Sequence, residues 1–261
     1  MKIGFLGAGH LGKSIITGLL NSKKYQKKDF KIVIDSDQSK EYFAKSGYQV
    51  SQDWNYLQDC DLVILAILPQ NIKELKDKLQ STFKKQTIIS VASGITLQQL
   101  QKILPSCLIT RVMPNTSCQF NQSMTMVVSE GNKAANDYAL AIFNLLGRTI
   151  VLREEKMHTF IAICGSASAY LYYWLQPLMK LAAIDQIKPG DSKLIITNLL
   201  LGVAANIGHS TDSLETLQNQ VTAPGGTTFE AIKVFDEYHL QDIIKQAIDA
   251  VARKSVAQGL E

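Results

Sequence analysis

The chain has 261 residues, of which 46% are hydrophobic and 19% are charged. This length and composition are typical of a globular protein with one large domain or two domains of ordinary size. The formal net charge is +4, and the densest basic group, Lys23, Lys24, Lys27 and Lys28, reads as a solvated loop. The sequence therefore gives no reason to expect a nucleic-acid partner.

The chain opens with a pattern that is typical of dinucleotide-binding proteins. Residues 2–6 form a short apolar run, Gly7, Gly9 and Gly12 follow as G-x-G-x-x-G, and residues 13–20 have helical character. In this context Gly7 permits a tight turn, Gly9 lets the backbone approach a pyrophosphate, and Gly12 lets the helix pack closely on the strand. The alternative interpretation is a glycine-rich turn that binds no ligand.

Apolar runs continue to alternate with helical segments up to about residue 153. Runs without polar alternation indicate strands buried on both faces of a parallel sheet. We therefore expect an α/β, doubly wound, mainly parallel Rossmann domain over residues 1–153. The expected strands are 31–35, 62–66, 87–91 and 108–112, with 124–128 and 149–152 at the edge, and the expected helices are 39–45, 72–83 and 96–103.

From residue 154 the strand signals stop, and residues 154–261 are expected to form an all-helical domain. The expected helices are 156–163, 166–183, 191–208, 213–220, 227–238 and 240–258. Residues 159–179 and 194–211 contain no formally charged residue, which raises the question of a membrane span. Polar residues and Pro177 interrupt these stretches, so we expect helices that dimerisation buries, and no membrane segment.

The four cysteines, Cys60, Cys107, Cys118 and Cys164, show neither C-x-x-C nor metal-ligand spacing. Free thiols and the lack of a signal peptide predict a cytoplasmic protein, and no metal site is expected.

The glycine turn is one of four segments that together carry a family resemblance. The other three are 111–116 (R-V-M-P-N-T), 165–170 (G-S-A-S-A-Y) and 223–228 (A-P-G-G-T-T). In order and spacing the chain resembles the pyrroline-5-carboxylate reductase family over nearly its whole length. The resemblance implies reduction of the cyclic imine 1-pyrroline-5-carboxylate to L-proline with NAD(P)H, in proline biosynthesis. It also implies a homodimer or higher homo-oligomer with a small-molecule substrate.

The resemblance and the glycine motif together predict a set of cofactor-binding residues. These are Gly7, Gly9, His10, Leu11, Gly12, Asp35, Ser36, Ala66, Leu68, Pro69, Ala92 and Asn115. Asp35 occupies the place of a ribose-binding acid in NAD-selective folds, and its carboxylate would repel a 2′-phosphate, whereas Ser36 could bond that phosphate. A solvated loop acid is the alternative for Asp35. The family resemblance favours NADP(H), and NAD(H) stays open.

The substrate-binding residues are predicted from the segments 165–170 and 223–228. The resemblance implies that Ser166 contacts the substrate and that the Thr228 hydroxyl reaches its ring nitrogen. Gly225, Gly226, Thr227 and Thr228 open a helix, whose free N–H groups can receive a carboxylate. An ordinary helix start with a threonine N-cap is the alternative. Arg111 is interpreted as one partner of a salt bridge at a strand end rather than as a ligand.

The sequence departs from the family pattern at several positions near the expected substrate. Ser168 replaces a proline, Ala223 a serine and Leu68 a lysine; Gln218 and Asn219 replace a Lys-Asp pair; Ser117 replaces a proline. Because of these changes, reduction of a different imine remains an alternative function. A hydroxyacid dehydrogenase with Lys156 or Lys180 as its acid also stays open, as does a non-catalytic cofactor-binding paralogue.

Overall fold

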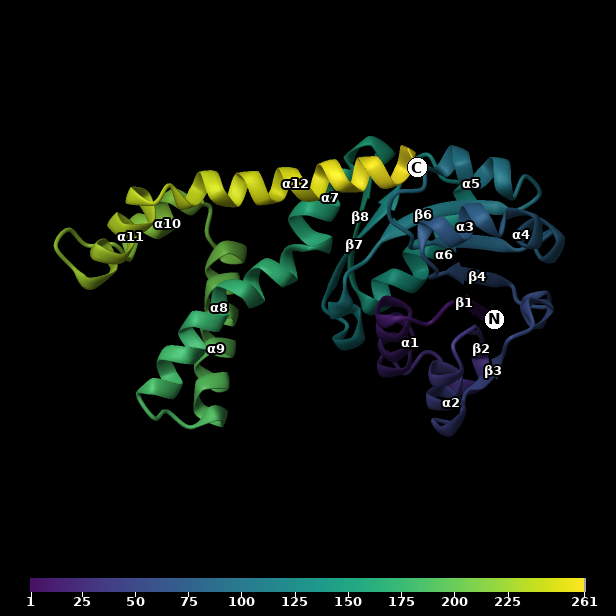
Figure 1. The fold of residues 1–261 in the computed structure, drawn as a ribbon, viewed down its shortest axis with the longest axis horizontal. Coiled ribbons are helices and arrows are strands. Elements are labelled where there is room, and N and C mark those ends of the chain that lie inside the picture. The colour runs from purple at the N-terminus through teal and green to yellow at the C-terminus, as the bar shows by residue number, and fades with distance from the viewer. Residues whose placement is uncertain (261) are drawn as a thin grey trace. The chain divides into compact units, whose positions relative to one another are not determined.

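Eight strands form one sheet within residues 1–260, which are the residues that the computed structural model describes (Figure 1). Their order is β3-β2-β1-β4-β5-β6-β7-β8. Pairing is parallel throughout except between β6 and β7, which are antiparallel. The strands are β1 (Ile3–Leu6), β2 (Phe30–Val33), β3 (Gln49–Ser51), β4 (Leu62–Leu65), β5 (Thr87–Ser90), β6 (Leu108–Met113), β7 (Ser123–Val128) and β8 (Gly147–Leu152).

The predicted doubly wound, mainly parallel sheet is confirmed, and the run 3-2-1-4-5-6 is the strand order of a dinucleotide-binding fold. Every residue of β1, β4 and β5 is buried, as expected for strands covered on both faces. Strand β3 is not among the expected strands. It has only three residues, none fully buried, so it lacks the apolar run that marks the other strands.

Successive side chains of each strand enter different cores, because they point to opposite faces of the sheet. Phe5 and Ile64 belong to one core, which also holds apolar residues of α1 (His10–Asn21) and α6 (Lys133–Phe143). Leu6 and Leu65 belong to the second core, together with residues of α3 (Pro69–Glu74), α4 (Lys76–Thr82), α5 (Leu97–Ile103) and α7 (Met157–Phe160). Helices therefore cover both faces, and α2 (Asp37–Lys45) follows β2.

Two helical expectations for this part of the chain need correction. The expected single helix over 72–83 is two helices, because the backbone at Leu75 (φ −101°, ψ 20°) leaves helical geometry between α3 and α4. The expected helix over 156–163 begins as α7 and becomes a π-helix over Ile161–Gly165. Helix α6 was not anticipated, although Asn132 caps its start by accepting hydrogen bonds from Ala134 and Ala135.

By their contacts, residues fall into two compact units. One contains residues 1–166 and the end of the chain from residue 250 on, and the other spans residues 167–249. The second unit is helical and contains α8 (Ala167–Ile184), α9 (Pro189–His209), α10 (Leu214–Gln220), α11 (Thr227–Glu237) and most of α12 (Leu240–Leu260). The division of the sequence at residues 153 and 154 stays a prediction.

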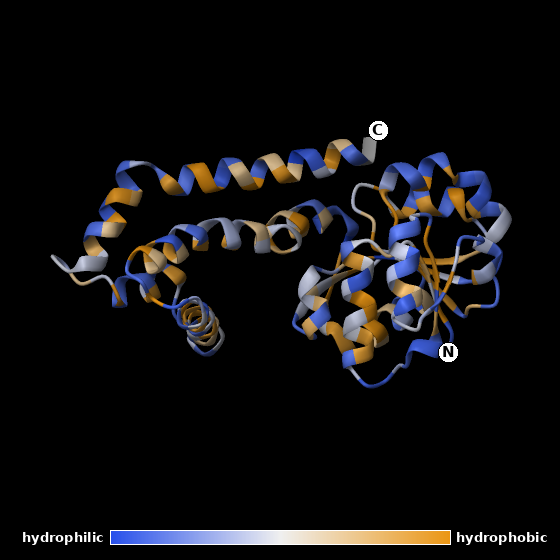
Figure 2. Cartoon of the chain, turned by 60° about the horizontal axis from the view of Figure 1, so that its bottom comes forward, coloured by the Kyte–Doolittle hydropathy of each residue, from blue (hydrophilic) through white to orange (hydrophobic). Residues whose placement is uncertain are grey.

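Many residues of α8 and α9 are hydrophobic (Figure 2), and many of their apolar side chains are exposed within the protomer. Ile184 is 75% exposed and Leu201 is 63% exposed within the protomer. Among the described residues no helix is both long enough and apolar enough to cross a membrane. Exposed apolar surface on this scale indicates contact with another protein surface.

Replacing Asp59 by asparagine is expected to lower stability at neutral pH and to have little effect near pH 2. Asp59 accepts hydrogen bonds from Lys2 (2.8 Å) and Lys31 (2.6 Å), which lower its pKa to about 2. A carboxylate whose pKa is depressed in the fold stabilises it above its unfolded pKa, and this is lost as pH falls through the folded value. Because Asp59 is 52% exposed, we expect a loss of less than about 1 kcal/mol at neutral pH, measured by urea unfolding of both proteins from pH 7 to pH 2.

Candidate active site

The carboxyl ends of three neighbouring strands bring the predicted cofactor segments together. Leu6 pairs with Leu65, and Leu65 pairs with Ser90, so β1, β4 and β5 end at the same edge of the sheet. The segments that follow them, 7–12, 66–69 and 91–96, therefore start side by side. In open α/β sheets ligands bind in the crevice outside these strand ends.

Two glycines of the first segment are required by backbone geometry. Gly7 has φ +89°, and a Cβ atom there would lie 2.6 Å from the Ala66 carbonyl oxygen. A Cβ atom on Gly12 would lie 3.1 Å from the Gly7 carbonyl oxygen and 3.3 Å from the Ala66 side chain. Gly7 thus makes the tight turn and Gly12 allows α1 to lie against the sheet, as the motif predicts.

Gly9 has a different environment, because apart from Gly9 and its two chain neighbours no atom of the protein lies within 4 Å of the position of an added Cβ. Gly9 is the N-cap of α1, and no side chain caps this helix end. His10 is exposed and Leu11 is half-buried at the first turn. Packing therefore does not explain this glycine, whereas an open space before an uncapped helix start fits a phosphate group.

The segment after β2 carries the residues that could distinguish the two nicotinamide cofactors. Asp35 and Ser36 are both exposed. The Ser36 hydroxyl caps α2 by accepting a hydrogen bond from the Ser39 N–H at 3.4 Å. Gln52 donates to the Asp35 carbonyl at 3.2 Å and accepts from the Lys40 ammonium at 3.3 Å. These residues present one carboxylate, one hydroxyl and one cation on the same stretch of surface.

The segment after β4 turns directly into α3. Pro69 is the first residue of this helix and Leu68 is its N-cap, with no side-chain cap. The Leu68 side chain is 59% exposed, at the position where the family pattern has a lysine. Leu68 thus places an apolar side chain at the carboxyl end of β4, where the family pattern has a positive charge.

Asn115 lies just beyond β6 and contacts the π-helix. Its side-chain N–H donates to the Cys164 sulfur at 3.6 Å, and its side-chain oxygen accepts from the Ser117 N–H at 3.1 Å. The Ser166 N–H closes the π-helix by donating to the Ile161 carbonyl at 2.8 Å. Burial raises the pKa of Cys164, so its thiol is protonated at neutral pH and is not prepared to act as a nucleophile.

The segment 223–228 forms a tight turn that begins α11. Gly225 has φ +72°, and the Gly226 N–H donates to the Ala223 carbonyl at 2.9 Å. Gly226, and not a threonine, is the N-cap, so the alternative of a threonine-capped helix is wrong. Thr227 and Thr228 are exposed in the first turn of the helix. Uncapped N–H groups and two hydroxyls are therefore available to an anionic ligand here.

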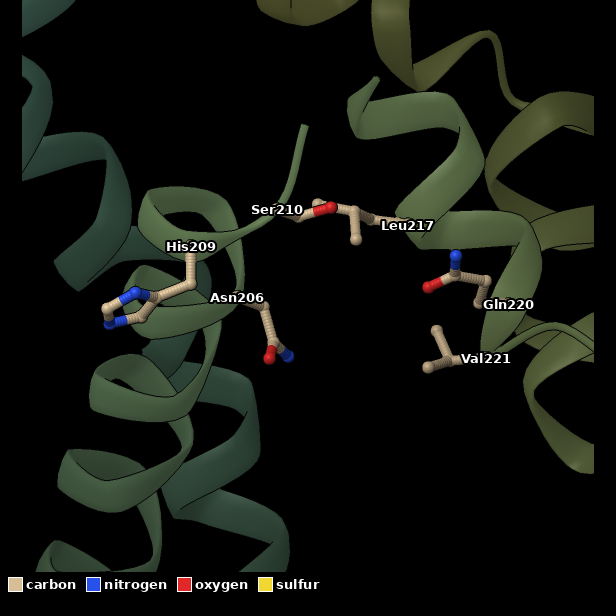
Figure 3. Close-up of a pocket in the computed structure, with 6 residues that line it drawn as sticks. All are labelled: Asn206, His209, Ser210, Leu217, Gln220 and Val221. Atoms are coloured by element: carbon tan, nitrogen blue, oxygen red, sulfur yellow. The ribbon is translucent and has the colours of Figure 1, made fainter. Parts of the chain in front are cut away.

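A pocket of about 360 Å³ lies in the same helical unit, between the end of α9 and α10 (Figure 3). Gln220 and Val221 lie on one side of it and Asn206 on the other, while Ser210 points toward Leu217. The exposed amide groups of Asn206 and Gln220 make this surface polar. It precedes the 223–228 turn directly in the sequence.

The interpretation of Arg111 as part of a salt bridge is confirmed. Its guanidinium lies 2.5 Å from the Glu154 carboxylate, and the Arg111 side chain is only 4% exposed. The partner, Glu154, was not predicted from the sequence, because it lies 43 residues away and carries no motif. Within residues 1–260 no group of three or more His, Cys, Asp or Glu side chains could hold a metal ion.

Comparisons with known proteins agree along the whole chain. The family model "Pyrroline-5-carboxylate reductase dimerisation" matches residues 154–258, and "NADP oxidoreductase coenzyme F420-dependent" matches residues 2–94. The pyrroline-5-carboxylate reductase of Haemophilus influenzae is 29% identical over 260 residues, which cover 97% of this chain and 96% of the relative. That of Staphylococcus haemolyticus is 28% identical over 263 residues, with 98% and 97% covered.

Solved structures give the same result. The 1-pyrroline-5-carboxylate reductase of Streptococcus pyogenes is 29% identical, with a TM-score of 0.87 and 98% of each chain covered. The Plasmodium falciparum pyrroline carboxylate reductase with NADP bound shares the fold, with a TM-score of 0.89, 21% identity, and 99% of this chain and 98% of that chain covered. These sequence and structural matches show that the chain is similar to pyrroline-5-carboxylate reductases over nearly its whole length, and that residues 154–258 match the dimerisation region of that family.

Proposed function

We propose that this protein reduces 1-pyrroline-5-carboxylate to L-proline with NADPH, as a step of proline biosynthesis. The observation that carries the proposal is the glycine turn, in which Gly7 and Gly12 are fixed by packing while the space beside Gly9 is open. This turn stands in a chain that matches reductases of this name over 97% or more of its length. NADH is the alternative cofactor.

The bound nicotinamide would supply the hydride to the imine carbon. The chain's own part is then to bind and orient, because hydride transfer to an iminium carbon needs close alignment more than a strong protein acid. The first turn of α1 would hold the pyrophosphate, and the segments 66–69 and 91–96 would line the cofactor beside it. The remaining cofactor candidates keep their predicted roles, with Asn115 next to the π-helix.

The substrate residues are proposed on the chemistry of the 223–228 turn. The N–H groups at the start of α11 would hold the substrate carboxylate, since a helix N-terminus carries partial positive charge. The Thr228 hydroxyl would donate to the ring nitrogen and so favour the geometry and protonation that the reaction requires. Ser166 would contact the substrate from the end of the π-helix.

The protein is proposed to act as a cytoplasmic homodimer or higher homo-oligomer on a small cyclic imino acid. Support comes from the exposed apolar side chains of α8 and α9 and from the dimerisation model that matches residues 154–258. A second copy of the chain would cover this surface.

One observation favours a related substrate as the second candidate. Leu68 exposes an apolar side chain where the family pattern has a lysine, and Ser168 replaces a proline near Ser166. Removing a cation and changing the backbone near a substrate site alters which ligand is bound best. A less polar cyclic imine would fit these changes.

The test is oxidation of NADPH and NADH by the purified protein with 1-pyrroline-5-carboxylate, followed at the nicotinamide absorbance. Proline formation with saturation in both substrates would support the proposal. Binding of a dinucleotide without turnover of this imine would exclude the proposed substrate, and a panel of cyclic imines without the carboxylate would then test the second candidate. Binding without turnover of any imine would indicate a non-catalytic cofactor-binding protein.

Replacing Asp35 by asparagine is expected to raise the preference for NADPH over NADH about tenfold. The change removes one negative charge that repels the 2′-phosphate of NADPH, and it weakens one acceptor for the ribose 2′-hydroxyl of NADH. The measurement is the ratio of kcat/KM for the two cofactors. Glu41→Gln removes a nearby exposed acid of α2 and is the control for general surface charge. An unchanged ratio in Asp35→Asn would assign Asp35 to the solvated loop.

A further inference from the structure

The loop that follows β5 is held in an unusual conformation by the end of the chain. Gly94 has φ +70°, and a Cβ atom on it would lie 2.5 Å from the Cβ atom of Gln258 in α12. The Ser93 hydroxyl lies 3.5 Å from the side-chain oxygen of Gln258. This loop, residues 92–97, begins at the crevice edge of the sheet, beside the segments that follow β1 and β4.

Arg111, on the neighbouring strand, bonds one end of the same loop directly and is linked to the other end through Glu154. One of its terminal nitrogens donates to the Ala92 carbonyl at 3.4 Å. The other donates to the Glu154 carboxylate at 2.5 Å, and the same carboxylate oxygen accepts the Leu97 N–H at 2.7 Å. Ala92 opens the loop and Leu97 begins α5, so the pair of Arg111 and Glu154 fixes both ends of the 92–97 loop.

The segment that carries Glu154 is itself joined to the end of α12. His158 Nδ1 lies 2.9 Å from the Ser255 hydroxyl oxygen, and Ser255 is buried. One turn further along α12, Gln258 meets Gly94. The 92–97 loop is therefore supported at its ends by Arg111 and Glu154, and at its middle by the end of the chain.

Stability alone does not explain a charged pair at this place. Arg111 is 3% exposed, and a buried ion pair is commonly no more stabilising than apolar side chains of similar volume, because both ions lose their hydration. The planar guanidinium contributes defined geometry instead, since its N–H donors hold two hydrogen-bond acceptors at a fixed angle to each other. An apolar pair could fill this volume but could not tie the Ala92 carbonyl to the Leu97 N–H.

We propose that Arg111 is a positioning residue for the part of the dinucleotide that lies beside the 92–97 loop. By fixing both ends of the 92–97 loop it presents Ala92 and Ser93 to the cofactor in one conformation, so that the loop does not have to be ordered on binding. This inference rests on the proposed use of a dinucleotide cofactor. In this proposal Arg111 and Glu154 act through the 92–97 loop.

Two variants of Glu154 separate the hydrogen-bond geometry of the Arg111–Glu154 pair from its charge. Glu154→Gln keeps an oxygen that can accept from Arg111 and from the Leu97 N–H, but it leaves the buried guanidinium without a counter-charge and should lower Tm. Glu154→Ala removes both the charge and the acceptor. We expect NADPH affinity, measured by nicotinamide fluorescence, to fall about tenfold in Glu154→Ala and to stay within about twofold in Glu154→Gln.

Hydrogen exchange of residues 92–97 in each variant gives the second readout. Exchange should become faster in Glu154→Ala and stay near that of the unmodified protein in Glu154→Gln. Phe143→Leu, in the core on the other face of the sheet, is the control for lost stability and should lower Tm without changing NADPH affinity. Faster exchange with unchanged NADPH affinity would overturn the proposal, and so would equal losses of affinity in both Glu154 variants.

Neither readout uses the imine. If the protein binds NADPH but does not turn over 1-pyrroline-5-carboxylate, the proposed substrate fails while the role of Arg111 is still decided by these two measurements. If no dinucleotide binds to the folded protein, the role of Arg111 fails as well.

Discussion

Replacing Thr228 by alanine is expected to lower kcat for imine reduction by about 10- to 100-fold, the range for losing one positioned donor at a reacting centre. Thr228 lies in the first turn of α11, next to N–H groups that no side chain caps. Its hydroxyl is the group that we propose to hold the ring nitrogen while the helix start holds the carboxylate. The side chain is exposed in the protomer, so its loss should change stability little.

Three measurements make this expectation specific. NADPH affinity and Tm of Thr228→Ala should equal those of the unmodified protein, because the cofactor candidates lie in the other unit of the chain. Thr228→Ser keeps the hydroxyl and should restore most of the activity. Thr222→Ala removes a nearby hydroxyl that only bonds the Gln218 carbonyl, and it is the control. Unchanged kinetics in Thr228→Ala would remove this threonine from the mechanism.

The sequence was sufficient to predict most of the sheet and the geometry of the glycine turn after β1, because both depend on local patterns. Uninterrupted apolar runs indicated β1, β4 and β5, and these strands are buried at every position. The motif Gly7, Gly9 and Gly12 predicted a tight turn, an open approach and a close packing contact, and each glycine has the environment expected of it. These features need no information from distant parts of the chain.

Several features could not be read from local patterns because they depend on contacts over long distances. Glu154 lies 43 residues from Arg111, and Gln258 lies 165 residues from Ser93. Strand β3 is formed by pairing with β2 rather than by its own sequence, since Gln49 is exposed and neither of its neighbours in the strand is fully buried. The sequence left a threonine N-cap open as the alternative at the start of α11, and the structure, with its turn at Gly225, places Gly226 in that position.

The departures from the family pattern also acquire a meaning in the structure. Leu68 lies at the N-terminus of α3, where its exposed side chain borders the crevice. The sequence change from lysine removes a charge from this rim, while the glycine turn on the neighbouring strand end is intact. Leu68 belongs to the 66–69 segment that we propose to line the cofactor, so we expect this change to leave dinucleotide binding in place and to alter which imine is preferred where the substrate meets the cofactor.

The second large effect is expected for Gly9→Ala, which should weaken NADPH binding at least about 30-fold, because a methyl group would occupy the space through which the pyrophosphate approaches the backbone. The fold should tolerate the change. Apart from Gly9 and its two chain neighbours, no atom of the protein lies within 4 Å of the added Cβ, and the backbone at Gly9 (φ −64°, ψ −164°) is extended. An added Cβ can therefore conflict only with a ligand, and the measurement is NADPH affinity beside Tm.

Two matched glycines distinguish this effect from general damage. Gly190→Ala, in the first turn of α9, also meets no atom within 4 Å and should leave both Tm and NADPH affinity unchanged or slightly raise Tm. Gly7→Ala should lower Tm instead, since Gly7 has φ +89° and its added Cβ would press on the Ala66 carbonyl. Normal NADPH affinity in a folded Gly9→Ala protein would mean that the turn receives no phosphate. Loss of affinity without loss of Tm, in Gly9→Ala alone, would locate the pyrophosphate at the start of α1.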